Sequence, residues 1–460
     1  MELSFEGRAK ALNDRPLHTS GQTVIYWMQN SQRPTDNPAL DQAIALANEQ
    51  GVGVTVYVAL DTTVPHATAR AFSFLLDGLC ETTRLLAERR ITSVVRAEAP
   101  VAGLAALARE VRPCAVVTDL SPLRRGRRLR REAAAALAAF DVPLIRVDGD
   151  HIVPLHLIGK EHWAARTIRP VIQRLLPTWL QEPATVEPRH SGVSLAGIDL
   201  EQTSTEHLLD TLGVDRAVPA AEDAPGGSGA AAHRLSSFVT DILPGYAGNG
   251  KSADRAGSGI SPYLRFGQIS PLRLALTAQH ADVPEEDRAA FLEELIVRRE
   301  LASNFVAYNP AYDRLDGLPD WARKTLDKHA DDPRPFLYTR AELTAAETHD
   351  PIWNAAQREL LARGRIHNYV RMYWGKKIIE WSRTPAEALG TALWLNDRFA
   401  LDGRCANGFT NVLWCFGKHD RAWGERPVFG TIRWMSDRGM ASKFDLKPYL
   451  KRWGAPELPL

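Results

Sequence analysis

One stretch near the C-terminal end carries most of the side chains that could do chemistry. Residues 364–381 read GRIHNYVRMYWGKKIIEW and have helical periodicity. About one turn holds His367, Asn368, Arg371 and Met372, and a tryptophan pair, Trp374 and Trp381, follows seven residues apart. At ~1.5 Å of rise per residue, these two indoles share one helix face roughly 10 Å apart. A cationic, amide-bearing turn followed by spaced indoles favours a buried redox or stacking site; a core helix that buries large tryptophans is the simpler alternative.

Two further stretches could bind polar ligands. The segment SGISPYL (258–264) offers small residues and hydroxyls, and a helix opening at Ser261 would direct its positive end at a phosphate. Ser-Pro also starts many helices for capping alone. Glu293 and Glu294 lie in an apolar helical stretch, where a carboxylate costs free energy unless it has a partner or faces solvent. Neither stretch identifies a ligand by itself.

Basic and aromatic residues concentrate towards the C-terminus. Residues 351–460 contain 18 Lys and Arg against 10 Asp and Glu, and eight of the twelve tryptophans. Cations bind phosphates and flat rings stack on unpaired bases, so this composition fits a nucleic-acid groove. A helical domain with a solvated basic face would have the same composition. The run RRGRRLRR (124–131) also has two interpretations, a site for an anion or nucleic acid and, more commonly, a solvated helix start.

Length and composition limit the class of protein. A chain of 460 residues is too long for one core, so two domains with connecting segments are expected. No run of 18 apolar residues is present, so no membrane partner is expected. The N-terminal MELSFEGRAKALNDRP lacks the apolar region of a secretory signal, and the four cysteines have no CxxC spacing that would predict a disulfide framework or a metal site. We expect a cytoplasmic monomer.

The N-terminal third alternates strand-like with helix-like segments. Short stretches rich in Val and Ile predict strands at 23–30, 52–60, 91–98, 114–122 and 142–150. Helical stretches lie between them, at 38–50, 69–90, 101–111 and 127–140. This order predicts a doubly wound parallel sheet, whose ligands bind at the carboxyl ends of the strands. Residues 28–33, Asp61 and 119–125 would form the lip of that pocket, and no GxGxxG fingerprint follows the first strand.

The rest of the chain divides into a connection and a helical region. Residues 177–232 are rich in Pro, Gly, Ser and Ala, which predicts an interdomain linker that wraps the surface or is partly mobile. Residues 233–460 show apolar spacing of three and four, which predicts helices. The predicted fold is therefore an α/β domain (1–176), a long linker (177–232) and an all-α domain (233–460).

Seven motifs, in a fixed order, carry a resemblance to a known family. They are YWMQNSQRPTDNPAL, GSGISPYLRFGQIS (257–270), FLEELIVRREL (291–301), ETHDPIWNAA (347–356), RIHNYVRMYWGKKIIEW (365–381), LNDRFALDGRCANGF (395–409) and GKHDRAWGERPVFGTIRWM (417–435). Over roughly residues 8–452 the chain resembles the photolyase/cryptochrome superfamily, and specifically class II cyclobutane pyrimidine dimer photolyases. The resemblance implies an N-terminal antenna domain and a C-terminal domain that binds FAD and DNA. It also implies light-driven repair of dimers in double-stranded DNA, by electron transfer from reduced FAD to a flipped-out dimer.

The resemblance also assigns an FAD site. The residues that would bind the FAD phosphates are Tyr246, Ser258, Gly259, Ile260, Ser261 and Leu264. Arg298 and Asn304 would complete the same wall of the FAD site. Arg371 and Asp402 match a buried ion pair beside the flavin ring, where the cation stabilises reduced, anionic flavin and the carboxylate compensates the cation. Asn396 matches the position that contacts flavin N5, with Asn407 as the alternative. An amide suits this position because it donates or accepts.

Further residues are assigned to the lesion, the DNA and electron transfer. Glu294 and Asn368 would hydrogen-bond the dimer, and Met372 would pack against it. The tryptophans and cations assigned to the lesion walls and the DNA are Trp414, Trp423, Arg433, Arg438 and Lys443. The chain that re-reduces FAD would run from Trp374, nearest the flavin, through Trp353 to Trp381 at the surface, with Tyr338 as a further donor.

Three points stay open at the level of sequence. The family's Arg-Asn-Asp-Pro segment is absent after Tyr246, where this chain reads YAGNGKSADRAGSG, so Lys251 or Arg255 would replace a phosphate-contacting arginine. The first domain would hold an antenna chromophore of the 8-hydroxy-5-deazaflavin type, another pigment or none. The alternatives to a repair enzyme are a cryptochrome-like photoreceptor that keeps FAD, and a nucleotide-binding domain fused to a helical DNA-binding module.

Overall fold

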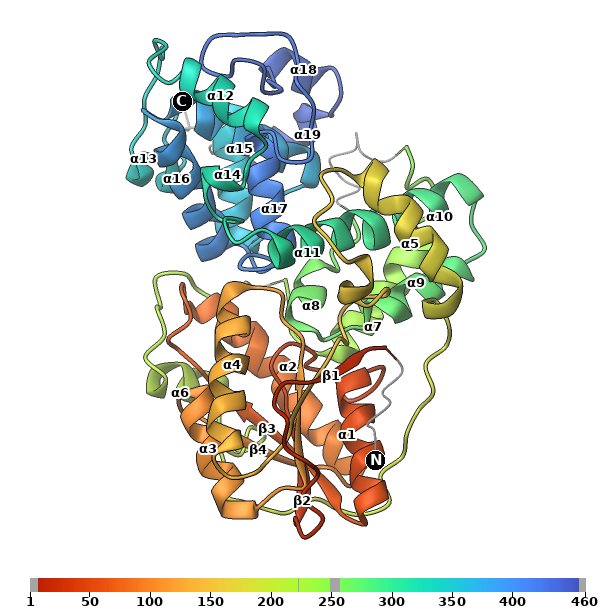
Figure 1. The fold of residues 1–460 in the computed structure, drawn as a ribbon. Helices are drawn as coiled ribbons and strands as arrows, with labels where there is room; N and C mark the ends of the chain where they lie inside the picture. The colour runs from red at the N-terminus through yellow and green to blue at the C-terminus, as the bar shows by residue number, and fades with distance from the viewer. Residues whose placement is uncertain (1–6, 222, 249–256, 455–460) are drawn as a thin grey trace.

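The computed structural model describes residues 7–221, 223–248 and 257–454. Within these residues a six-stranded sheet has the order β1-β6-β5-β2-β3-β4 (Figure 1). Its strands are β1 (Ala9–Ala11), β2 (Thr23–Trp27), β3 (Gly53–Ala59), β4 (Thr92–Arg96), β5 (Ala115–Asp119) and β6 (Leu144–Val147). Strands β2 to β6 are parallel, as predicted, and β1 is an additional edge strand that pairs antiparallel with β6. The fold class predicted for the first domain is confirmed.

Helices cover both faces of this sheet, which explains why its strands read as continuous apolar runs. They are α1 (Pro38–Gln50), α2 (Ala69–Glu88), α3 (Pro100–Val111) and α4 (Arg124–Ala138). In β2, Val24 and Tyr26 pack into one core with α1 and α2, whereas Ile25 and Trp27 pack into the opposite core with α3 and α4. Alternate side chains of one strand thus hold two helical layers on one sheet.

The segment predicted as a linker runs along the first domain. The backbone N–H of Ile198 donates to the carbonyl of Val95 at 2.7 Å, and Ser191 forms a bridge with Val54 of β3. Helix α6 (Thr205–Thr211) packs on α2. The preceding helix, α5 (Ala165–Trp179), packs instead against the helical region. The predicted linker therefore wraps the surface, and the domain boundaries at 176 and 232 remain predictions.

The C-terminal half is helical, as predicted. In the described ranges its elements are α7 (Ser228–Ser237), η2 (Phe238–Ile242), α8 (Ser261–Phe266), α9 (Pro271–Gln279), α10 (Glu285–Leu292), η4 (Glu293–Arg298), α11 (Arg299–Tyr308), η5 (Leu315–Gly317), α12 (Asp320–Lys328), α13 (Arg340–Ala345), α14 (Pro351–Arg363), α15 (Asn368–Trp381), α16 (Pro385–Phe399), α17 (Ala406–Cys415), α18 (Asp437–Ala441) and α19 (Leu446–Trp453). Helix α11 contacts both η4 and α17 and so connects two groups of helices (Figure 1). No helix in these ranges is long and apolar enough to cross a bilayer.

Buried polar contacts fix the sheet domain against the helical region. Arg70 on α2 donates to the carbonyls of Leu360 and Phe399, each at 3.0 Å. Arg33, which follows β2, donates to the carbonyl of Gly267 at 2.9 Å. Because charged donors bound to buried carbonyls are costly to separate, these contacts hold the two parts in one orientation.

The arginine run at the start of α4 belongs to the same interface. Arg124 pairs with Asp313 at 2.7 Å, and Arg127 donates to the carbonyl of Ala307 at 2.8 Å. Arg130 is buried and donates to the carbonyl of Ser121 within its own domain, at 2.7 Å. The run is therefore not only a solvated helix start, because it docks α4 on the last turn of α11 and on the loop that follows it.

Candidate functional site

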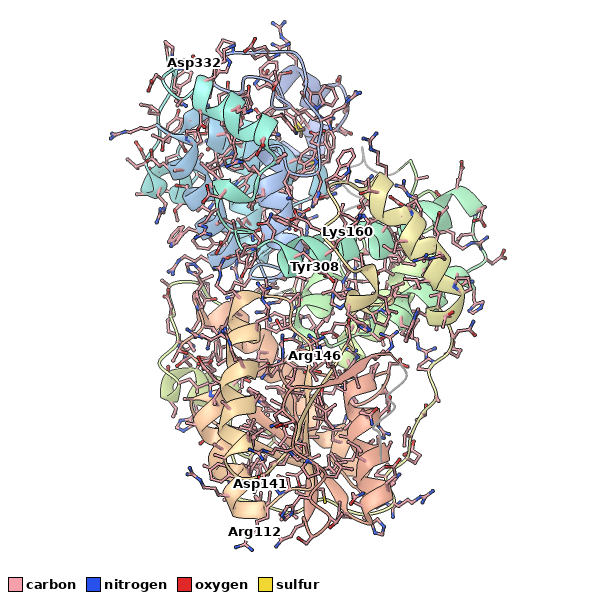
Figure 2. The ribbon with its side chains drawn as sticks, viewed as in Figure 1. Arg112, Asp141, Arg146, Lys160, Tyr308 and Asp332 are labelled. Carbon is pink, nitrogen blue, oxygen red and sulfur yellow. The ribbon has the colours of Figure 1, made fainter. Side chains whose placement is uncertain are left out.

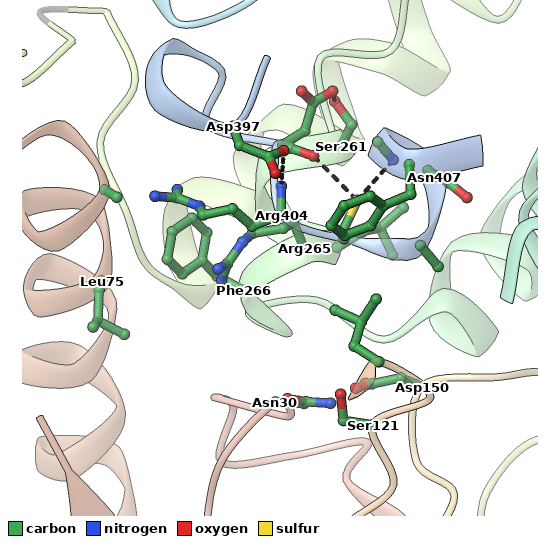
Figure 3. Close-up of a pocket in the computed structure, with 18 of the residues that line it drawn as sticks. Asn30, Leu75, Ser121, Asp150, Ser261, Arg265, Phe266, Asp397, Arg404 and Asn407 are labelled. Atoms are coloured by element: carbon green, nitrogen blue, oxygen red, sulfur yellow. Dashed lines mark hydrogen bonds between the residues drawn. The ribbon is translucent and has the colours of Figure 1, made fainter. Parts of the chain in front are cut away.

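A cavity of about 1100 Å³ lies between the carboxyl ends of the strands and the helical region. The sheet side contributes residues of the lip that strand order predicts, including Asn30 and Ser121. Figure 3 shows these two across the cavity from Ser261 and Asn407 of the helical side. Small-molecule pockets commonly enclose ~300–1,000 Å³, so this cavity suits a large, extended ligand.

Arg371 on α15 organises the helical side of the cavity. Its guanidinium binds both carboxylate oxygens of Asp402, at 3.0 and 2.8 Å, and the amide oxygen of Asn396 at 2.7 Å. Ser261, the first residue of α8, donates its hydroxyl to Asp402 at 2.9 Å. Burial alone would raise the pKa of Asp402, but the Arg371 cation and these hydrogen bonds hold the pKa below its usual range. The pair stays ionised at neutral pH and places a fixed cation beside the cavity.

The two candidate asparagines differ in what their amides face. Asn396 on α16 is buried; its oxygen accepts from Arg371 and its NH₂ donates to Asp397 at 3.0 Å. Asn396 is not among the described residues that line the cavity, whereas Asn407, in the first turn of α17, is. Asn407 therefore borders the cavity, whereas the amide of Asn396 is bound to Arg371 and Asp397.

The turn predicted to cradle phosphates does face the cavity. The residues of this turn and its neighbours that line it are Tyr246, Ser258, Gly259, Ser261 and Leu264. The side chain of Ile260 is buried in the core beneath them. Gly259 has φ of +68°, and a Cβ there would lie 2.6 Å from Nε of Arg234, so this turn requires glycine. Arg234 holds the turn by donating to the Ser258 carbonyl at 2.6 Å.

Two residues of the predicted FAD wall lie elsewhere. The guanidinium of Arg298 is half exposed and lies 3.3 Å from the carboxylate of Glu293. Asn304 is fully buried; its amide accepts from the N–H of His162 and donates to the carbonyl of Lys160, both at 2.7 Å. The oxygen and the NH₂ group of this amide therefore both hold the loop that carries Lys160 against α11 (Figure 2).

The residues predicted to bind a lesion come from η4, α15, α17 and the segment that follows α17. Element η4 is π-helical, a local widening that is frequent at functional sites. It carries Glu294, whose carboxylate keeps contact with solvent although the surrounding protein raises its pKa by burial; Arg298 opposes this shift and Glu293 reinforces it. Asn368, exposed at the start of α15, lines the cavity. Met372 packs against the core one turn later.

Two cations lie close to the ring of Trp414 on α17. The buried ammonium of Lys376 lies 5.0 Å from the ring centroid and donates to the Cys415 carbonyl at 2.5 Å. Burial lowers the pKa of Lys376 to about 8. The guanidinium carbon of Arg433 lies 5.7 Å from the centroid of Trp414 and 4.9 Å from that of Trp423. Since cations are attracted to the electron-rich faces of indoles, Arg433 joins the two tryptophans predicted to bind a lesion.

The other cations predicted to contact DNA lie on the same C-terminal segment. Arg438 and Lys443 are exposed on and after α18, and Trp423 is itself exposed. Lys251 and Arg255 lie outside the described residues.

Three tryptophans form a continuous row of rings. The ring centroids of Trp374 and Trp353 are 6.3 Å apart and their planes are 4° from parallel, and Trp381 lies 5.8 Å from Trp353. The contacts follow the predicted order. The prediction that Trp381 lies at the surface is wrong: it is 1% exposed, because Tyr338 and His349 cover it, with centroids at 5.4 and 5.2 Å.

Several polar residues around the cavity escaped prediction from the sequence. Arg265 and Arg404 line it, and burial lowers the pKa of both, that of Arg404 to about 9. Arg404 donates to the His66 carbonyl at 2.6 Å, and its backbone N–H donates to Asp397 at 2.8 Å. Both arginines lie inside motifs of the resemblance, GSGISPYLRFGQIS for Arg265 and LNDRFALDGRCANGF for Arg404, and these motifs are the signal that could have identified them.

Solved structures define the class of fold. The chain matches a bacterial class III photolyase from Agrobacterium tumefaciens with a TM-score of 0.74 at 19% identity, over 94% of this chain and 86% of that chain. It matches a cryptochrome from Synechocystis sp. PCC6803 with a TM-score of 0.74 at 16% identity, over 95% of this chain and 89% of that chain. The fold is that of the photolyases and cryptochromes.

Sequence relatives define the family more narrowly. The DNA photolyase family model matches residues 24–189. A deoxyribodipyrimidine photo-lyase from Methanothermobacter thermautotrophicus is 41% identical over 97% of both chains. Proteins of the same name from Oryza sativa subsp. japonica and Potorous tridactylus are 39% and 37% identical, over 94% and 95% of this chain and 87% and 82% of theirs. The chain belongs to the DNA photolyase family.

Proposed function

We propose that the chain is a deoxyribodipyrimidine photo-lyase, a carbon–carbon lyase that uses light to repair cyclobutane pyrimidine dimers in DNA. The observation that carries this proposal is the shared cavity, where the ionised Arg371–Asp402 pair and the amides of Asn368 and Asn407 face one space. Relatives of that name, 36–41% identical over most of the chain, support the same activity.

FAD is the cofactor that these residues fit, and the photolyase and cryptochrome family generally binds it. Hydroxyls and backbone N–H groups around Gly259 would hold its phosphates. The Arg371 cation would stabilise a reduced, anionic flavin ring, with Asp402 compensating the charge. We assign the contact with flavin N5 to Asn407, because the amide of Asn396 is already used by Arg371 and Asp397. Bound and reduced, FAD supplies the electron for repair when it absorbs blue light.

The remaining residues of the site would bind a dimer that has left the duplex. Extrusion of a base costs stacking and pairing energy, and this cost is lowest for a damaged base. Trp414 and Trp423 would recover ~1–3 kcal/mol for each base that stacks on them. Glu294, whose raised pKa favours a carboxyl that donates, would hydrogen-bond the dimer and stabilise the negative charge that it gains. Asn368 would bind the base edges, and Met372 would pack beside them.

Other parts of the chain would serve the reduction of FAD and the binding of duplex DNA. The row Trp374–Trp353–Trp381 would bring electrons to oxidised FAD. Phosphates of double-stranded DNA would pair with Arg433, Arg438 and further cations. Lys251 and Arg255 stay candidates for the absent arginine, and an antenna pigment in the first domain stays a prediction.

Dimer-containing DNA tests this function. Chemically reduced, FAD-loaded protein is incubated with the DNA in blue light and in darkness, and intact pyrimidines are counted. We expect repair in light alone. Repair in darkness, or none in light by fully reduced protein, would contradict the proposal. No repair in light by a yellow, FAD-loaded protein would favour a cryptochrome-like photoreceptor. A protein that binds no flavin would favour a nucleotide-binding domain fused to a helical DNA-binding module.

A further inference from the structure

The row of tryptophans ends on a pair of residues that cover Trp381. The N–H of Tyr338 donates to the carbonyl of Trp381 at 3.2 Å, and the two rings meet edge to face. His349 packs against the same indole at 62° to its plane. Phe336 stacks on the outer face of His349 with centroids 3.7 Å apart. Trp381 is buried, whereas His349 is exposed, so this pair is the row's route to solvent.

The phenol and the imidazole of this pair share a hydrogen bond. The hydroxyl oxygen of Tyr338 lies 2.7 Å from Nδ1 of His349 and accepts the backbone N–H of His349 at 3.0 Å. A phenol has a single hydrogen, and the backbone N–H already fills one acceptor position. In the imidazole tautomer that carries its hydrogen on Nε2, Nδ1 accepts the hydroxyl hydrogen of Tyr338.

Two helix caps hold the pair in place. Tyr338 directly precedes Thr339, which forms a reciprocal capping box with Glu342 at the start of α13. His349 directly precedes Asp350, whose carboxylate caps α14 by accepting from the N–H groups of Ile352 and Trp353. Such caps fix the entry of the chain into each helix. The cap of α14 thus ties His349 to the helix that carries the middle tryptophan of the row.

We propose that His349 accepts the proton when Tyr338, the further donor expected from the family resemblance, gives an electron to the tryptophan row, an inference that rests on the proposed function. The oxidant is the Trp381 radical cation, formed when photoexcited oxidised FAD takes an electron through the row. Tyr338 gives one electron to Trp381, its O–H bond breaks, and the proton passes to Nδ1 of His349. The products are neutral Trp381, a neutral tyrosyl radical and an imidazolium ion, so charge and atoms balance.

The proton acceptor decides whether the electron stays on Trp381 or returns to Tyr338. An oxidised phenol is a much stronger acid than a phenol. Without a base to take its proton, the electron returns from Trp381 to Tyr338. His349 takes the proton over a hydrogen bond that already exists, and its exposed ring then exchanges with water. His349 is therefore a positioned base for electron transfer and takes no part in binding the lesion.

Transient absorption on the full-length, FAD-loaded protein tests the pair. Flashes excite oxidised FAD, and the tryptophan radical cation and the tyrosyl radical are followed by their separate spectra. Because a positioned base contributes ~10²–10⁴-fold, His349→Ala should slow tyrosyl formation by ~100-fold or more. Tyr338→Phe should abolish the tyrosyl signal, and adding His349→Ala to it should change nothing further. The matched control is His280→Ala, which removes an exposed histidine at the end of α9.

Two readouts separate a proton acceptor from a merely structural histidine. Tyrosyl formation should slow in D₂O in the natural protein, and free imidazole should restore part of the rate in His349→Ala. A tyrosyl rate in His349→Ala equal to that of His280→Ala would overturn the proposal, as would tryptophan radicals without a tyrosyl radical in the natural protein. Repair by chemically reduced protein is measured in parallel. If repair persists, these results bear only on the role of His349, whereas an absence of repair would contradict both the proposed function and this inference.

Discussion

Replacing Asp402 by asparagine tests the ion pair on which the site depends. The side chains of Arg371 and Asp402 are 17% and 15% exposed. Removing one partner of a buried pair costs ~3–5 kcal/mol, because the other charge is left without compensation. The Asn396 oxygen still accepts from Arg371 in the variant, so the expected loss of unfolding free energy lies at the lower end, about 3 kcal/mol. FAD affinity should fall as well, because an uncompensated Arg371 shifts from its place beside the cavity.

The assay is urea unfolding of the FAD-free protein, followed by tryptophan fluorescence. The matched control is Glu110→Gln, which removes the partner of Arg96 in a surface pair 3.2 Å long and should cost at most ~1 kcal/mol. Since the Arg371 cation lowers the pKa of Asp402, the stability that it contributes is present above pH 3.8 and is lost as the pH falls through the lower, folded value. The difference in unfolding free energy between the natural protein and Asp402→Asn should therefore disappear in acid. A cost for Asp402→Asn no greater than that of the control would refute this reasoning.

Four further outcomes are expected. Asn407→Ala should change the absorbance spectrum of bound flavin, whereas Asn396→Ala should lower stability by ~1–3 kcal/mol through the lost partner of Arg371; equal effects on both readouts would contradict the assignment. Trp374→Phe should abolish photoreduction of oxidised FAD, as seen by flavin absorbance, while chemically reduced protein keeps repairing. Burial raises the pKa of Glu300 from 4.5 to about 7, so stability should fall by about 3 kcal/mol between pH 4.5 and 8, and pH-dependent unfolding of Glu300→Gln should lack this fall. Arg433→Gln should reduce by about 1 the slope of log affinity against log salt for duplex DNA, and an unchanged slope would exclude a phosphate contact.

Local sequence signals were enough to predict the architecture. The runs of Val and Ile in β2 and β3 and the prolines that open α1 and α14 act within a few residues, so strands and helices fall close to the predicted ranges. The parallel order followed from their alternation. Strand β1 has no such signal, because its three residues, AKA, form a strand only through pairing with β6.

The site depended on contacts between distant residues, which no local pattern encodes. The choice between Asn396 and Asn407 turns on which amide Arg371 occupies, and both lie in the same motif. Asn304 is predicted as part of the FAD wall, but its amide hydrogen-bonds a loop more than 140 residues away. The resemblance predicts Trp381 at the surface, whereas Tyr338 and His349, which cover it, lie 43 and 32 residues earlier in the chain.

The most direct test of the central claim follows dimer splitting itself. Reduced, FAD-loaded protein is mixed with a DNA oligomer that contains one pyrimidine dimer and is excited by single flashes of blue light. We expect a recovery of ultraviolet absorbance, from the restored 5,6 double bonds, that rises with each flash and stops when the dimers are exhausted. We also expect Glu294→Gln and Asn368→Ala to lower the recovery per flash. No recovery from fully reduced, DNA-bound protein would contradict the account.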